Sequence, residues 1–175
     1  MNFDLELSTE ILRQTPYTLS RMLDGLSTEW TESKGDQENW SPYDVIGHLI
    51  HGEETDWIRR AEIILTQGVD RPFDKYDRLA QFERSKGKSL SDLLQEFAHL
   101  RNHNLEKLVN FQLTPEHLAL KGMHPARGEV TLEQLLSAWV VHDLNHVSQT
   151  VRVLSARYAT AVGPWTAYLG ILNRR

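Results

Sequence analysis

Two histidines four residues apart, His142 and His146, have the spacing in this chain that most directly indicates chemistry. Successive residues of an α-helix are rotated by about 100°, so on a helix these two imidazoles lie nearly above one another on one face. A single metal ion can then reach a nitrogen of each ring. Leu135 and Val153 share this stripe, which predicts that the pair faces the interior. The alternative is two hydrogen-bonded core histidines.

A third imidazole ligand must come from another helix, and His48 is the best candidate. It lies one to two turns into a predicted helix beside Ile46, Leu49 and Ile50, so we expect it to point inward. His51 lies about 60° away around the same helix. We expect His51 to be partly exposed, or to lie behind the ligands rather than among them.

The remaining histidines carry weaker signals. His99 and His103 repeat the four-residue spacing, but the residues around them are polar, namely Arg101, Asn102 and Asn104. This pattern predicts a solvated helix face. His117 and His124 fall in or near predicted loops, and we assign them no role.

The chain has no cysteine, which excludes disulfides, thiolate metal ligands and a cysteine nucleophile. His51-Gly52-Glu53 matches the His-x-Glu of zinc nucleobase deaminases, but their cysteine pair is missing. A di-iron carboxylate bundle needs two Glu-x-x-His motifs and two further glutamates. Glu96 with His99 fits once, Asp143 with His146 fits only with a shorter acid, and one of the paired histidines stays unused. We therefore rank the di-iron interpretation lower.

Four helices must position these residues, and the sequence predicts an all-α fold, a four-helix bundle. The expected helices span about 8–26, 41–67, 89 to a point before Thr114, and 131–158. Thr15-Pro16 is an alternative start for the first helix, since proline fits the first turn. Ser41-Pro42-Tyr43-Asp44 and Thr131-Leu132-Glu133-Gln134 have the pattern of capping boxes.

The connections favour one domain covering 1–175. The segment 68–88 is charged, irregular and long for a bundle loop, which indicates a crossover between the second and third helices. A short extended turn is expected around Gly128, within 123–130. The tail after Tyr158, with Gly163-Pro164-Trp165, predicts a turn and a short closing helix.

Composition limits the partners. Of the 175 residues, 40 % are hydrophobic and 25 % charged, and the net charge is -5 with no basic stripe. This balance disfavours nucleic acid and anionic membrane surfaces as partners. The first residues are acidic where a signal peptide would be basic, and no apolar run has membrane-spanning length, so we expect a cytoplasmic protein.

Two stretches together resemble a known family. The first is 40–49, from Trp40 through His48 to Leu49, followed by Glu54, Trp57 and Arg60. The second is 131–136 followed by Trp139, His142-Asp143-Leu144-Asn145-His146 and Gln149. They resemble the second and fourth helices of the DinB-like (YfiT-like) family, and the resemblance extends to Gly163-Pro164-Trp165.

This resemblance implies an up-down-down-up bundle in which three histidines bind one divalent metal ion, typically nickel or zinc. The matching positions are His48, His142 and His146. It also implies a homodimer and a small-molecule substrate, with activity as a metal-dependent hydrolase or as a transferase that uses a low-molecular-weight thiol. Three imidazoles leave coordination positions open, as in catalytic sites.

The catalytic residues remain unassigned. Asp44, Arg59 and Gln149 share the ligand faces by helical angle and are candidates for the pocket. We prefer the ordinary explanations, which are a cap for Asp44 and bundle-edge positions for Arg59 and Gln149. A non-catalytic, metal-stabilised stress-response bundle is the alternative function. Because ligand imidazoles must be neutral, an all-histidine site predicts that metal affinity falls below about pH 6.5.

Overall fold

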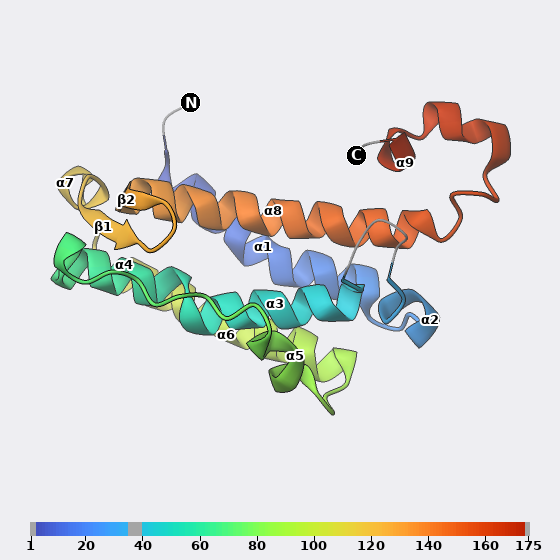
Figure 1. Ribbon diagram of the computed structural model, residues 1–175, viewed down its shortest axis with the longest axis horizontal. Coiled ribbons are helices and arrows are strands. Elements are labelled where there is room, and N and C mark those ends of the chain that lie inside the picture. The colour runs from blue at the N-terminus through green and yellow to red at the C-terminus, as the bar shows by residue number, and fades with distance from the viewer. Residues whose placement is uncertain (1–2, 35–39, 174–175) are drawn as a thin grey trace.

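The computed structural model describes residues 3–34 and 40–173, which form a bundle of long helices with short elements at its ends (Figure 1). The long helices are α1 (Leu5–Leu23), α3 (Pro42–Thr55) continued by α4 (Trp57–Thr66), α6 (Leu90–Asn110) and α8 (Leu132–Ala156). The short elements are α2 (Thr28–Thr31), η1 (Gly68–Asp70), α5 (Ala80–Ser85), α7 (Pro115–Leu118), β1 (Lys121–His124), β2 (Gly128–Thr131), η2 (Gly163–Tyr168) and α9 (Gly170–Asn173).

The helix directions give the expected up-down-down-up topology. In Figure 1, α1 and α8 run one way, while α3 with α4 and α6 run the other way. Helix α6 packs against both α1 and α3, and α8 packs against α1, α3 and α4. The crossover between α4 and α6 carries η1 and α5. The predicted four-helix bundle is confirmed.

Capping explains most helix starts. The side chains of Ser41, Ser89 and Thr131 each accept a hydrogen bond from the backbone three residues on, in capping boxes at the starts of α3, α6 and α8. Such a side chain satisfies an amide that the helix itself leaves unpaired. The signals for these three helices were therefore sufficient to place their starts.

The first helix differs from its prediction. It begins at Leu5, because the carboxylate of Asp4 accepts a hydrogen bond from Leu7 N, and it ends at Leu23. A start at Thr15-Pro16 is wrong, since Pro16 lies buried inside the helix. Leu26, the last residue of the predicted span, lies beyond the observed helix and is 39 % exposed.

The predicted second helix is interrupted once, at Asp56, where the backbone has φ -107° and ψ -78°. The amide of Asp56 still bonds the carbonyl of Gly52, and the carbonyl of Asp56 accepts from Arg60 N. The backbone hydrogen bonds thus continue across the interruption, so α3 and α4 together act as one bundle element.

The core consists of two apolar clusters with a polar layer between them along each helix. One cluster contains Trp57, Leu132 and Trp139, and the other contains Leu19, Ile46 and Phe97. The buried polar side chains of α3, α6 and α8 that form this layer are His48, His51, Glu53, Arg101, Asn104, Asp143 and His146. All of them except His48 lie between the two clusters along their helices, and His48 lies among residues of the second cluster. Buried polar groups must be hydrogen-bonded or functional, so this layer is where a site is expected.

The connections also follow the predictions. Strands β1 and β2 form an antiparallel hairpin with His124 opposite Gly128, and Gly128 has the positive φ of 76° that the turn requires. After α8, the segment of η2 and α9 returns toward that helix. No helix in the described ranges is long and apolar enough to cross a membrane.

Candidate metal centre

Three histidines from two helices meet in the polar layer. The Nε2 atom of His142 lies 3.0 Å from Nε2 of His48 and 3.1 Å from Nε2 of His146. His48 comes from α3, whereas the other two come from successive turns of α8. His48 and His146 are buried and His142 is half-buried. Within the described part of the chain, the cluster of candidate ligand atoms comprises these three side chains.

The outer nitrogens of two of these rings are held by glutamine side chains. His48 Nδ1 lies 3.0 Å from Gln81 Oε1, and His146 Nδ1 lies 2.8 Å from Gln149 Oε1. An amide oxygen only accepts, so each Nδ1 carries the proton and donates it. Each Nε2 therefore carries a lone pair, which points toward Nε2 of His142.

This arrangement fits a cation better than it fits three bare imidazoles. The lone pairs of His48 and His146 both face Nε2 of His142, which can carry at most one proton. A proton on Nε2 of His142 can be donated to only one of the two neighbouring Nε2 atoms. In the other contact, two nitrogens would face each other with no proton between them. A cation in contact with all three nitrogens removes the conflict, and imidazole is a ligand that zinc and nickel accept.

The cluster is enclosed by aromatic rings and by the bundle core. The ring of Trp40 lies 4.7 Å from that of His48 and 6.0 Å from that of His146, between centroids, and Trp57 presents its ring at 5.0 Å from His142. Burial lowers the pKa of His48 to about 3 and that of His142 to about 2, and the neighbouring His146 lowers both further. These two imidazoles are therefore neutral at physiological pH, as ligation requires.

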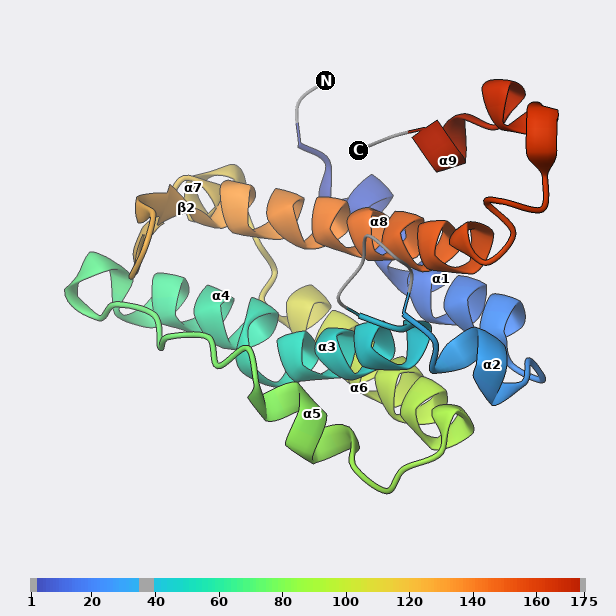
Figure 2. The same cartoon turned by 45° about the vertical axis from the view of Figure 1, so that its right-hand side comes forward.

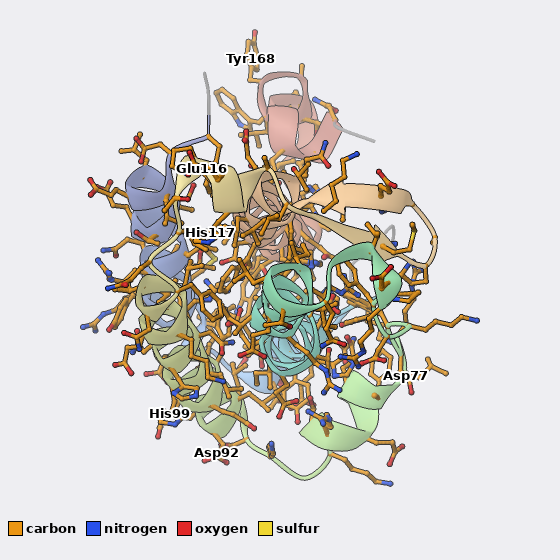
Figure 3. All side chains as sticks on the ribbon, turned by 90° about the vertical axis from the view of Figure 1, so that its left-hand side faces the viewer. Asp77, Asp92, His99, Glu116, His117 and Tyr168 are labelled. Atoms are coloured by element: carbon orange, nitrogen blue, oxygen red, sulfur yellow. The ribbon has the colours of Figure 1, made fainter. Side chains whose placement is uncertain are left out.

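The histidines of α6 stay away from the cluster, as predicted. His99 and His103 are exposed, and Figure 3 shows His99 on the outer side of α6. Glu96 pairs with Lys88 at 2.6 Å. A di-iron site built on Glu96 and His99 is thus wrong for this structure, because both side chains lie outside the polar layer. His117 and His124 instead hydrogen-bond the backbone locally, at Thr114 N and Ala126 N.

For His51 the sequence left two alternatives, partial exposure or a place behind the ligands. Partial exposure is wrong: the residue is 4 % exposed, because the crossover folds over it and places the Tyr76 ring at 4.8 Å. Neither ring nitrogen has a hydrogen-bond partner. His51 lies at the wall of a cleft of about 160 Å³ between α3–α4 and residues 74–77. It lies beside the cluster and is not part of it.

Of the three further candidates for the pocket, Asp44, Arg59 and Gln149, one contacts the cluster. Asp44 caps α3 through Ser41, which is its ordinary role. Arg59 is exposed and pairs with Asp74 at 3.3 Å, at the rim of the cleft beside His51. Only Gln149 contacts the cluster, through His146.

The sequence interpretation missed a buried ionic network directly beneath the cluster. Arg101 was predicted to be solvated, but it is 0 % exposed. Its guanidinium donates to Glu53 Oε1 at 2.7 and 3.0 Å and to the carboxylate of Asp143 at 2.6 and 3.0 Å. Asn104 Nδ2 and Trp139 Nε1 donate to the same Glu53 carboxylate.

This network ties all four bundle elements together. Arg101 Nη1 also donates to the carbonyl of Leu12 in α1, at 2.6 Å. That carbonyl would normally accept from the amide four residues on, but Pro16 has no N–H. A signal for the network was present in the sequence, since Pro16 leaves a buried carbonyl that needs a donor, and Asp143 sits next to a predicted ligand on an inward stripe.

Comparisons with known proteins agree with this picture. A model of the DinB superfamily matches residues 11–150. Among solved structures, YfiT from Bacillus subtilis is similar, with a TM-score of 0.75 and 23 % sequence identity over 89 % of this chain and 90 % of that one. It is described as a probable metal-dependent hydrolase with an unusual four-helix bundle topology. Among curated proteins, no sequence matches.

Proposed function

The chain belongs to the DinB superfamily, and from this premise we propose that it is a metal-dependent hydrolase acting on a small molecule. His48, His142 and His146 would hold one divalent ion, with zinc or nickel as the expected metal. The observation that carries the proposal is that the Nε2 atoms of three imidazole rings converge. The outer nitrogen of each ring, Nδ1, contacts a glutamine in His48 and His146 and is buried in His142.

Three protein ligands leave room for a fourth, exchangeable one, which is the pattern of a catalytic rather than a structural ion. When bound, such an ion supplies Lewis acidity and lowers the pKa of a water or thiol that it contacts. The protein's own part is to hold the imidazoles neutral, oriented and enclosed. Gln81 and Gln149 orient two rings, and Trp40 and Trp57 restrict water around them.

The proposal is tested with protein purified without a histidine tag, depleted of metal and reloaded with zinc, nickel or cobalt. A hydrolase should turn over members of a panel of small esters and amides only when loaded, with a rate governed by an ionisation near pH 7. The matched variants are His48→Ala, which should lose activity, and His99→Ala, which removes an exposed histidine and should keep it.

A titration with a low-molecular-weight thiol separates the other functions. In the cobalt form, a thiolate bound at the open position would give an intense sulfur-to-metal charge-transfer band, and the chain itself has no cysteine to produce one. We expect no such band at physiological thiol concentrations. A strong band would favour the thiol-transferase reading. If the protein shows no band and no turnover, and its melting temperature falls strongly when the metal is removed, the ion is structural.

The lowered pKa values change the pH dependence expected from the sequence. Because His48 and His142 stay neutral in the folded protein down to about pH 3 and 2, protons do not compete with the metal at these two ligands near pH 6.5. In the unfolded chain the same residues accept protons below about pH 6.5. The unfolded state then binds more protons, so the free energy of unfolding of the metal-free protein falls as the pH drops below 6.5.

Melting curves of the metal-free protein between pH 7 and pH 5 measure this effect. The melting temperature should fall with pH, and the fall should be shallower in His142→Asn, which removes one of the two imidazoles with a lowered pKa. His99→Asn, at an exposed position, should behave as the wild type. Equal slopes in the wild type and in His142→Asn would contradict the neutral state of that ring in the folded protein.

A further inference from the structure

The crossover between α4 and α6 directs two side chains to one nitrogen of one cluster histidine. Gln81 Oε1 lies 3.0 Å from His48 Nδ1, and the Tyr76 hydroxyl lies 2.8 Å from the same atom. Both oxygens can accept, so the single N–H of this ring faces two acceptors. Neither residue belongs to a bundle helix: Tyr76 lies in the irregular part of the crossover and Gln81 in α5.

Gln81 is buried at a cost that packing alone does not explain. Its side chain is 1 % exposed, and its amide Nε2 has no hydrogen-bond partner. A buried unpaired amide group costs roughly 1–3 kcal/mol, and an apolar residue of the same length would avoid that cost. The polar contact that Gln81 does make is the one to His48, which indicates that this contact is why a glutamine is buried here.

Helix α5 packs against α3 (Figure 2). A Cβ placed on Gly47 would overlap Ser85 Oγ, whereas it would lie at an ordinary contact distance of 3.5 Å from Ser85 Cβ. The hydroxyl of Tyr43 lies 2.5 Å from the carbonyl of Ser85 and 2.9 Å from that of Lys88. Gly47 and Tyr43 of α3 thus hold α5 in contact with α3 beside His48.

We propose that the crossover is a positioning element for the metal ligand His48. Gln81 and Tyr76 keep the proton of that imidazole on Nδ1 and fix the ring plane, so that the Nε2 lone pair faces the cluster. Gly47 leaves space for α5 to pack against α3, and this packing places Gln81 next to His48. The predicted effect on metal affinity rests on the proposed function. The predicted tautomer of His48 does not, because it can be measured in the metal-free protein.

The first test removes the acceptors without leaving a polar group behind. Gln81→Met keeps the side-chain length, and Tyr76→Phe removes only a hydroxyl. In the metal-free wild type, ¹⁵N chemical shifts of His48 should report the Nδ1–H tautomer. In the double variant the proton should move to Nε2, where His142 Nε2 is the nearby acceptor at 3.0 Å. Zinc affinity, from competition with a chromophoric chelator, should fall about 10- to 100-fold.

Stability distinguishes positioning from packing. Gln81→Met removes an unpaired amide nitrogen, so the metal-free melting temperature should stay the same or rise while zinc affinity falls. A conservative variant, Gln81→Glu, retains an acceptor oxygen and should restore the affinity toward that of the wild type. A fall in both quantities, with no recovery in Gln81→Glu, would mean that Gln81 only packs, and would overturn the proposal.

The second test concerns the packing of α5 against Gly47 of α3. In Gly47→Ala the new methyl overlaps Ser85 Oγ, so either that hydroxyl rotates away or α5 shifts. A shift of α5 should reduce zinc affinity and weaken the Nδ1–H tautomer. Adding Ser85→Ala removes that oxygen and should restore both readouts. Failure of this rescue would show that Gly47 acts within α3 alone and would contradict the positioning role of the crossover.

The two proposals fail in different ways. If the protein binds no metal, zinc titrations of the wild type are flat, and the tautomer shift still decides the role of the crossover. If zinc binds tightly but the His48 tautomer and the zinc affinity are unchanged in the double variant, the metal proposal stands and the positioning proposal is wrong.

Discussion

Replacing His142 by alanine is expected to abolish tight metal binding. Its Nε2 atom lies between those of His48 and His146, so the substitution leaves two imidazoles that face an empty centre. Two neutral nitrogen ligands are too few for a tight site, and the loss should exceed the 10- to 100-fold effect typical of residues behind the ligands. A competition titration with a chromophoric chelator, on protein without a histidine tag, measures it.

The variant should remain folded, since His142 is only half-buried. His103→Ala, at an exposed position on α6, serves as the matched control and should bind as the wild type. Undiminished binding in His142→Ala, combined with loss in His99→Ala or Glu96→Ala, would revive the dinuclear carboxylate interpretation that the structure excludes.

The second large effect is expected at Arg101. Replacing it by methionine, which retains the bulk of the stem, leaves the carboxylates of Glu53 and Asp143 buried without their cation. Breaking a buried ion pair by removing one partner typically costs about 3–5 kcal/mol. The carbonyl of Leu12, which Pro16 leaves without a helical donor, loses its partner as well. Urea unfolding of the metal-free protein measures the loss.

Two comparisons make this prediction specific. Arg59→Met removes an arginine of an exposed pair with Asp74 and should cost at most about 1 kcal/mol. Neutralising both carboxylates in the Arg101→Met background, with Glu53→Gln and Asp143→Asn, should recover part of the lost stability, because no charge is then left unpaired. An Arg101→Met protein as stable as Arg59→Met would show that the network contributes little to the fold.

Local signals were enough to predict the bundle. Ser41, Ser89 and Thr131 form capping boxes, and apolar spacing defines α3, α6 and α8, so these elements could be located without tertiary information. The His-x-x-x-His spacing on α8 likewise predicted that His142 and His146 lie side by side. The choice of His48 over His51 rested on the apolar neighbours of His48 and on the angle of about 60° between the two positions around the helix, and the structure brings His48 to the pair.

The parts that were missed depend on contacts between distant segments. Arg101 sits in a polar stretch and resembles a surface residue until α1 and α8 supply the carbonyl of Leu12 and the carboxylate of Asp143. His51 resembles an edge residue until the crossover covers it. The role of Gln81 in the cluster is set by the docking of α5, which no periodicity in the crossover reveals.

The most direct test of the central proposal is an X-ray absorption spectrum of the zinc- or nickel-loaded protein, purified without a histidine tag. We expect one ion per chain, with three imidazole ligands and at least one further light-atom ligand that exchanges with added anions. A fourth ligand from a protein side chain, fewer than three imidazoles, or no bound ion after exposure to metal would contradict a three-histidine catalytic site at His48, His142 and His146.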